Sequence, residues 1–268
     1  MNVLIVHVHP EAKSLTSSLK DFAVEVLTQA GHSVQVSDLY TMNWKSQIDG
    51  EDFLERLNYD RLDIVNESGK AFSEGSQTSD VIAEQEKLRW ADAVIFQFSY
   101  WWFSMPAIMK GWVDRVFACG FAYGIGGSNR WRYGEGNLKG KRAMLSITIG
   151  GPEKDYSARG INGAIDDLLF PIHHGILFFP GMSVLPPFLV HSAGQLSEAG
   201  YGQVKANYRS RLLNLFITKP IPFRNQNDGD YDEAYQLKPG LEGDRTGLKI
   251  HQSIQTTVKK KQARTIAA

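Results

Sequence analysis

The chain has a single cysteine, no excess charge and no long apolar run, and each absence excludes a class of protein. Cys119 alone cannot form an intrachain disulfide or a thiolate metal cluster. The 29 Lys and Arg residues are balanced by 29 Asp and Glu, so no net field favours nucleic acid or an anionic membrane. No apolar run approaches the ~20 residues that cross a bilayer, and no secretory signal is recognisable. We therefore expect a cytoplasmic protein without membrane insertion.

The two best-known phosphate-binding motifs are also missing, since neither G-x-G-x-x-G nor a Walker A sequence follows the first apolar run. What the chain does contain is a regular alternation of strand and helix patterns. Apolar runs predict strands at residues 3–6, 33–39, 93–98, 143–149 and 182–191. Helical spacing predicts one helix that ends at Gly31 and four more at 79–90, 106–117, 164–179 and 197–217. A long excursion occupies residues 41–78.

This alternation predicts a parallel sheet with right-handed crossovers. Five such units fit the flavodoxin-like strand order 2-1-3-4-5. We therefore predict an α/β fold, a flavodoxin-like doubly wound five-stranded parallel sheet over residues 1–218. A small C-terminal extension follows at 219–268 and ends in a frayed basic tail. In this order the carboxyl ends of strands one, three and four face one cleft.

The loop after the first strand carries hydroxyl groups at the start of a helix. Ser14, Thr16 and Ser17, with the free N–H groups of the first helical turn, can hold phosphate oxygens. Ordinary N-capping by Ser and Thr explains the same residues equally well. His9 at the strand end can reach a phosphate, whereas His7 within the strand is expected to be a buried core histidine.

The loop after the third strand is strongly aromatic, because Tyr100, Trp101, Trp102 and Phe103 precede Pro106. Ligands bind at the carboxyl ends of strands in open α/β sheets, and large flat side chains there suit a large flat ligand such as a flavin. Aromatic clusters are usually core residues. These four fall in a turn, however, and cannot all be buried by their own domain, which favours contact with a ligand or another subunit.

The loop after the fourth strand combines Gly150-Gly151 with Tyr156. Backbone N–H groups at the two glycines are left uncovered and are candidates to bind the pyrimidine edge of a flavin, where reduction builds negative charge. The phenol of Tyr156 can donate a hydrogen bond or a proton there, although a purely structural hydroxyl is the alternative. The pair His173-His174 is not expected to bind a metal, since the side chains of two consecutive residues in a helix point in different directions.

These stretches together resemble the NAD(P)H:quinone oxidoreductase (DT-diaphorase) family. The resemblance is carried most specifically by Trp102-Phe103-x-x-Pro106-Ala107-Ile108-x-Lys110-Gly111-Trp112, together with Gly150-Gly151 and Tyr156. It implies a homodimer with one FAD per subunit, bound at the subunit interface, with FMN a less expected replacement. NADPH or NADH would pass a hydride to flavin N5, and a quinone would then take it from the same face.

The resemblance also implies a role for individual residues in three groups. The FAD-binding group contains His9, Ser14, Leu15, Thr16, Tyr100, Trp101, Trp102, Phe103, Ile147, Thr148, Ile149, Gly150, Gly151 and Tyr156. The substrate pocket contains Trp102, Phe103, Tyr123, Ile125, Phe179, Gln195, Tyr231 and Tyr235. The catalytic group contains Tyr156, Asn162 and Gly150, which would stabilise the reduced flavin.

Some positions depart from the better-known diaphorase. Asn162 replaces a catalytic histidine and cannot be a cation near neutral pH. Asn162 and Ile125 instead match a paralogue that prefers dihydronicotinamide riboside, although that paralogue lacks the C-terminal extension. Phe178 stands at one of its zinc positions, so we expect no metal. The alternatives are therefore a riboside-dependent quinone reductase, an azo- or nitroreductase, a flavin-binding electron carrier or redox sensor, and a flavin-free interaction protein.

Overall fold

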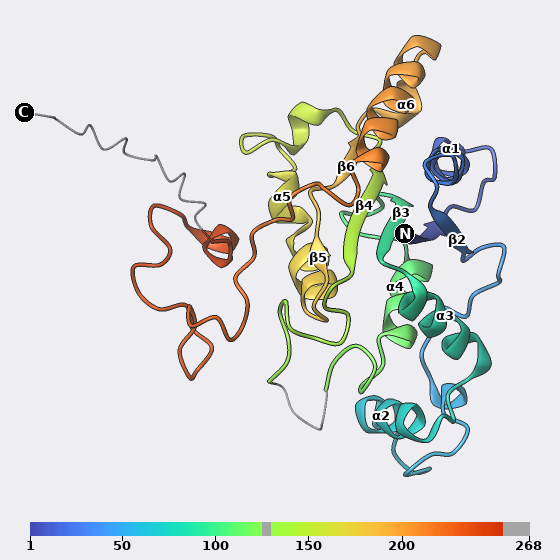
Figure 1. Ribbon diagram of the computed structural model, residues 1–268, viewed down its shortest axis with the longest axis vertical. Coiled ribbons are helices and arrows are strands. Elements are labelled where there is room, and N and C mark those ends of the chain that lie inside the picture. The colour runs from blue at the N-terminus through green and yellow to red at the C-terminus, as the bar shows by residue number, and fades with distance from the viewer. Residues whose placement is uncertain (125–129, 254–268) are drawn as a thin grey trace, which may run out of the picture.

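The computed structural model describes residues 1–124 and 130–253, and a parallel sheet lies between its helices (Figure 1). The sheet contains β1 (Asn2–Val8), β2 (Ser33–Asp38), β3 (Ala93–Ser99), β4 (Arg142–Thr148) and β5 (Ser183–Val184), in the order β2-β1-β3-β4-β5. The flavodoxin-like order predicted from the sequence is thereby confirmed. Strands β1, β3 and β4 are almost entirely buried, as their uninterrupted apolar runs indicated.

The fifth strand differs from the prediction. The prediction of a single strand at 182–191 is wrong. The segment forms two short strands, β5 (Ser183–Val184) and β6 (Phe188–Val190), which both pair with β4. Pro186 and Pro187 lie between them. Proline has no backbone N–H to donate to a ladder, so the strand is interrupted at this point.

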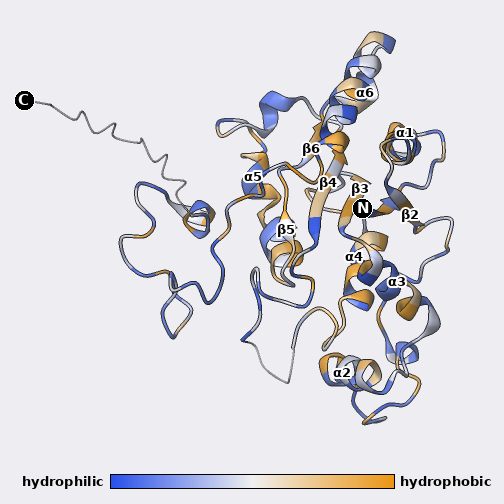
Figure 2. Cartoon of the chain, in the orientation of Figure 1, coloured by the Kyte–Doolittle hydropathy of each residue, from blue (hydrophilic) through white to orange (hydrophobic). Residues whose placement is uncertain are grey.

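Helices cover both faces of the sheet. On one face α1 (Leu15–Gln29) packs with α6 (Glu198–Leu213), and on the other α3 (Ser79–Trp90) packs with α4 (Ala107–Val116). Two separate clusters of buried apolar side chains fill these layers. Figure 2 shows hydrophobic residues gathered in the strands, whereas the C-terminal extension is largely hydrophilic.

The excursion between β2 and α3 contains two short helices, η1 (Gly50–Asp52) and α2 (Ile64–Glu74). It is tied to α4 by a buried ion pair, in which Arg115 Nε lies 2.7 Å from Asp52 Oδ1. The Arg115 guanidinium also lies 4.5 Å from the ring of Trp44. This pair fixes the excursion against α4.

The helix predicted at 164–179 is also interrupted. The segment forms α5 (Ile165–Leu168) and then a π-helix, η4 (Pro171–Phe178), in which Phe179 N–H donates to the His174 carbonyl five residues back. Pro171 has no N–H to continue the first helix, so the ladder restarts with a different period. The side chains of Phe170 and His174, four residues apart, lie next to each other, with ring centroids 4.6 Å apart.

The C-terminal extension folds back on the body of the chain beside α5 (Figure 1). Its buried Arg224 donates to the carbonyls of Ile250 and Leu241, at 3.0 and 2.6 Å, and pairs with Asp230. The extension also contains the short helix η6 (Gly247–His251). Within 1–124 and 130–253 we find no helix with both the length and the apolar character that a membrane span requires.

Candidate active site

Strands β1, β3 and β4 end at the same edge of the sheet, where three hydroxyl groups meet. Thr16 Oγ1 in the first turn of α1 lies 3.0 Å from Ser99 Oγ and 2.8 Å from Thr148 Oγ1, and the last two are 2.9 Å apart. Thr16 is buried, so its hydroxyl is used within the protein rather than presented to a ligand. This cluster joins α1 to the ends of β3 and β4 and fixes the position of the first loop.

The start of α1 nevertheless presents free donors. Ser14 caps the helix, its Oγ accepting from Ser17 N at 3.1 Å. The backbone amides of Leu15 and Thr16 donate to no other residue in the described part of the chain. The N-terminus of a helix with such amides is suited to binding an anion. Both interpretations of the serine cluster, capping and anion binding, are compatible with this arrangement.

The two histidines of β1 and its following loop have different environments. His7 is fully buried, and burial lowers its pKa to about 4, as expected for a core histidine. His9 lies at the strand end, where its Nδ1 accepts from Glu11 N at 3.0 Å and its ring meets Trp101 edge-on at 6.3 Å. Only His9 is therefore placed beside the aromatic loop.

The aromatic loop is a tight, strained turn. Trp101 and Ser104 exchange two backbone hydrogen bonds of 3.1 and 3.0 Å. The residues between them, Trp102 and Phe103, have φ values of 50° and 61°, as in a type I′ turn that normally requires Gly or Asn. Trp102 is also 96% exposed. Two bulky side chains held in left-handed geometry in solvent are an unusual combination, and such strain is concentrated at ligand sites.

Tyr100 lies beneath this turn, with its ring edge-on to both Phe103 and Tyr156 at 6.3 Å. Its hydroxyl is buried and has no hydrogen-bond partner among the residues that the structure describes. Burial, with a smaller contribution from Tyr156, raises the pKa of Tyr100 to about 12. The group is therefore a protonated donor at neutral pH and has no protein acceptor.

The glycine loop after β4 has an open face. Gly150 is exposed, and a Cβ placed there would meet nothing within 4 Å. The carbonyl of Gly151 accepts from Ser192 N at 3.0 Å, but neither glycine amide donates to another described residue. Two free amides, a free phenol and an exposed aromatic turn thus share one edge of the sheet, an arrangement that suits a flat ligand with acceptors along one side.

Tyr156 belongs to the short helix η3 (Glu153–Tyr156) and lies against the glycine loop. A Cβ at Gly151 would be 3.0 Å from its Cε2 and 3.4 Å from its hydroxyl. Its ring also meets His191 at a centroid distance of 5.5 Å. Asn162 closes the same loop, because its backbone N–H donates to the Asp155 carbonyl at 3.0 Å. Tyr156 is thus adjacent to Gly151, whose backbone amide is free of any described partner.

The remaining predicted pocket residues form a second group. Phe179 meets Tyr123 at 6.2 Å, and the guanidinium of Arg132 lies over both Phe179 and Tyr235, at 5.8 and 5.4 Å. Tyr231 is bonded through its hydroxyl to His251 Nδ1 at 3.0 Å. The residues of the three loops that follow β1, β3 and β4 are called the flavin-loop group below. Within residues 1–124 and 130–253, no hydrogen bond or ring contact joins the second group to the flavin-loop group.

Two predicted pocket residues cannot be assigned to either group. Ile125 lies outside the described residues. Gln195 is exposed in the short helix η5 (Ala193–Gln195), where its backbone N–H donates to the Ser192 carbonyl at 2.8 Å. Gln195 makes no contact with the residues of either group among those described above.

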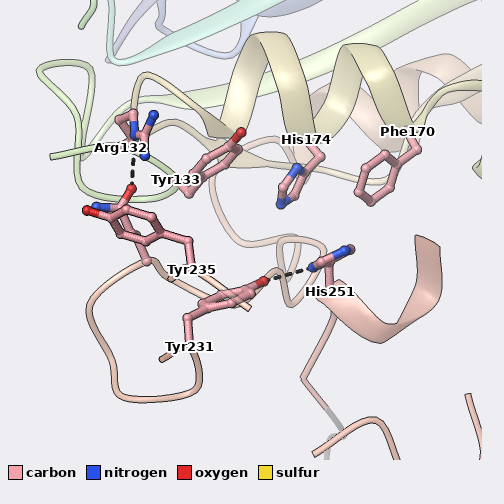
Figure 3. Close-up of a pocket in the computed structure, with 8 residues that line it drawn as sticks. Arg132, Tyr133, Phe170, His174, Tyr231, Tyr235 and His251 are labelled. Carbon is pink, nitrogen blue, oxygen red and sulfur yellow. Dashed lines mark hydrogen bonds between the residues drawn. The ribbon is translucent and has the colours of Figure 1, made fainter. Parts of the chain in front are cut away.

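Sequence reasoning missed a cavity of about 310 Å³ beside the second group (Figure 3). Tyr231 and Tyr235 were expected in a pocket, but the other lining residues were not: Arg132, Tyr133, Phe170, His174, Gln226 and His251. One usable signal was the four-residue spacing of Phe170 and His174, which places both on one side of a helix. The remaining residues come from segments far apart in the chain.

Comparison with known proteins agrees with the fold. The family described as "Flavodoxin-like fold" matches residues 1–212. The Ribosyldihydronicotinamide dehydrogenase-like protein traD of Penicillium crustosum is 51% identical over 265 residues, which cover 96% of this chain and 98% of that protein. NAD(P)H dehydrogenase (quinone) 1 of Rattus norvegicus is 37% identical over 254 residues, covering 94% of this chain and 91% of that protein.

A solved structure agrees with these relatives. The crystal structure of a candidate quinone reductase from Klebsiella pneumoniae is 51% identical, with a TM-score of 0.91. The match covers 94% of this chain and 100% of that one. The chain therefore belongs to the flavodoxin-like family that includes the NAD(P)H and ribosyldihydronicotinamide quinone dehydrogenases.

Proposed function

We propose that this protein is a flavin-dependent quinone reductase that takes its electrons from a reduced nicotinamide. The observation that carries the proposal is the group of unpaired donors at the carboxyl edge of the sheet, next to the exposed turn at Trp102 and Phe103. A ligand that fits must be flat and must carry acceptors on one edge. The isoalloxazine ring of a flavin has both properties.

FAD is the cofactor that these residues fit. The amides of Gly150 and Gly151 would donate to the pyrimidine edge, and the turn of Trp102 and Phe103 would lie against the ring. The free amides of Leu15 and Thr16, with His9 and Ser14 beside them, would hold the phosphates. Bound FAD supplies a two-electron carrier between the nicotinamide and the quinone. FMN, which has one phosphate and no adenosine, is the alternative cofactor.

The protein would contribute electrostatics and hydrogen bonding. Fixed N–H dipoles at Gly150 and Gly151 stabilise negative charge on the neighbouring ring edge without having to reorganise. Tyr156 lies beside them and can donate its phenolic proton to an oxygen on that edge. The neutral side chain of Asn162 is limited to hydrogen bonding there, because it has no titratable proton.

A homodimer would complete this site. The flavin-loop group and the group of Tyr123, Phe179, Tyr231 and Tyr235 lie apart in one subunit, so a second subunit could bring its aromatic group over the first subunit's flavin. The exposed ring of Trp102 would then be covered. Sedimentation of the flavin-loaded protein should give a mass near twice the 30.0 kDa of the chain. Specific activity should fall on dilution as the mass falls, whereas a fully active monomer would contradict a shared site.

The electron donor could be either NAD(P)H or dihydronicotinamide riboside. One relative is named for ribosyldihydronicotinamide and another for NAD(P)H. The extension at 219–253 favours the larger donors, because it adds Tyr231 and Tyr235 to the pocket side. Asn162 favours the riboside, as the sequence resemblance implied. Azo and nitro compounds are alternative acceptors on this scaffold, and a cytoplasmic location remains a prediction.

The proposal is tested by quinone reduction with the FAD-loaded protein. Initial rates measured over a grid of NADPH and quinone concentrations should give parallel double-reciprocal lines, since donor and acceptor use the same site in turn. Loss of activity when FAD is removed, and its return on adding FAD, should accompany this pattern. An electron carrier would bind FAD without this turnover, and a flavin-free interaction protein would not retain FAD at all.

A further inference from the structure

A cavity lies between the C-terminal extension and η4, and its walls are aromatic. Figure 3 shows Tyr133, His174 and Phe170 in a row on one side, with Tyr231 and His251 opposite. His174 is stacked between the other two rings, at 4.7 Å from Tyr133 and 4.6 Å from Phe170. The volume of the cavity, about 310 Å³, is near the lower end of the range for small-molecule sites. A ligand of one or two fused rings would fill it.

The cavity has one cation and no acidic side chain in its lining. Arg132 donates through Nε to Gln226 Oε1 at 3.1 Å, but no carboxylate pairs with it in the part of the chain that the structure describes. Its guanidinium lies over three rings, those of Tyr133, Phe179 and Tyr235, at 5.8, 5.8 and 5.4 Å. These rings fix the cation at the cavity wall and leave its remaining N–H groups for a ligand.

The two histidines of the lining do not add charge at neutral pH. Burial lowers the pKa of His174 to about 4, and burial also lowers the pKa of His251. His174 Nε2 is buried and has no partner among the described residues, whereas His251 Nδ1 is engaged by the Tyr231 hydroxyl at 3.0 Å. The cavity thus offers stacking surfaces and one fixed cation.

We propose that this cavity binds a planar aromatic acid. The ring of the ligand would lie between the row of Tyr133, His174 and Phe170 and the side of Tyr231. Its carboxylate or phenolate would meet the guanidinium of Arg132, whose planar fork suits a carboxylate. The cavity shares Tyr231 and Tyr235 with the pocket side of the proposed function. The inference goes beyond quinone reduction, because binding of the acid requires neither flavin chemistry nor turnover.

The test compares a charged probe with its neutral isostere. We would titrate the oxidised, FAD-loaded protein calorimetrically at pH 7 with 2-naphthoate and with 2-naphthamide, which differ in charge but hardly in shape. The naphthoate should bind at least about tenfold more tightly, as one charge-assisted hydrogen-bonded pair gives. Arg132→Gln should abolish the difference, whereas Arg61→Gln, a change of the same charge at an exposed residue, should preserve it.

Two further variants guard against a loss of folding at position 132. Arg132→Lys keeps the charge and should keep part of the preference for the acid. Tyr235→Ala removes an exposed ring beside the guanidinium and should weaken binding of the acid without changing the fold. The proposal is overturned if naphthoate does not bind, if the amide binds equally well, or if the preference survives in Arg132→Gln. Quinone turnover measured on the same samples reports separately on the proposed function.

Discussion

The ring of Tyr156 lies 3.0 Å from the point where a Cβ on Gly151 would stand, so only glycine lets the tyrosine approach the loop this closely. Gly151→Ala should therefore displace the ring by a few tenths of an ångström. Because small displacements at a reacting centre lower rates strongly, we expect flavin reduction to slow about tenfold, with FAD retained. Stopped-flow absorbance measures this, and Gly202→Ala, at an open position in α6, is the control. Equal rates for both variants would contradict the role given to this contact.

Removing the phenolic hydroxyl tests Tyr156 itself. Tyr156→Phe keeps the ring against Gly151 but removes its proton donor, so flavin should remain bound while its reduction slows, by about 10²-fold as for loss of a positioned acid. The measurement is the reduction rate in anaerobic stopped flow, with FAD content determined by absorbance. If Tyr156→Phe reduced flavin at the wild-type rate, Tyr156 would have no catalytic role.

Gly150 offers a test of what lies in front of the loop. A Cβ at this position meets no protein atom within 4 Å, so Gly150→Ala should leave the thermal stability of the flavin-free protein unchanged. The added methyl group would point into the space assigned to FAD, and flavin affinity should fall several-fold. Fluorescence titration with FAD measures the affinity. An unchanged affinity would show that the flavin edge lies elsewhere.

The strain at Trp102 predicts that a substitution which raises the stability of the flavin-free protein will weaken FAD binding. This residue has a φ of 50° and is 96% exposed, so Trp102→Asn removes little buried surface and places a residue that tolerates left-handed geometry. We expect the free energy of unfolding of the flavin-free protein to rise by about 1 kcal/mol, with weaker FAD binding. Urea denaturation and FAD titration measure the two effects. A variant that binds FAD as tightly as wild type would remove the ligand role of this turn.

Buried histidines predict acid sensitivity. Burial lowers the pKa values of His7 and His173 to about 4, below the ordinary 6.5. Between these values the unfolded chain binds more protons, so stability is fully present above about pH 6.5 and is lost as the pH falls toward 4. Each histidine contributes a slope of about 1.4 kcal/mol per pH unit. Urea unfolding at pH 7, 6 and 5 should show a shallower slope for His173→Gln than for wild type, and identical slopes would contradict this account.

The sheet and its order were predictable because strands buried on both faces read as uninterrupted apolar runs. The runs at Val3–Val6 and Ala93–Phe98 needed no tertiary information, and long crossovers between them dictate parallel pairing. The interruptions were harder to predict. The prolines at 171, 186 and 187 are visible in the sequence, but whether a proline bends an element or divides it depends on what packs around it.

The candidate site was predictable loop by loop but not as an assembly. Trp102 and Gly150 are conspicuous locally, because an aromatic run and a glycine pair follow buried strands. The bond between Thr16 and Thr148 joins residues 132 positions apart, and no local pattern reveals it. Arg132 was missed for the same reason, since its significance comes from Tyr235, a residue of the extension that folds back over it.

The most direct test of the central claim is the reductive half-reaction. The FAD-loaded protein would be mixed anaerobically with NADPH, NADH and dihydronicotinamide riboside in turn, and the loss of flavin absorbance recorded. We predict complete bleaching within the turnover time by at least one donor, followed by return of the absorbance when a quinone is added. Fast bleaching by NADPH or NADH would favour the diaphorase type of donor, and bleaching by the riboside alone would favour the paralogue. Absence of bleaching by all three would contradict the assignment as a nicotinamide-dependent quinone reductase.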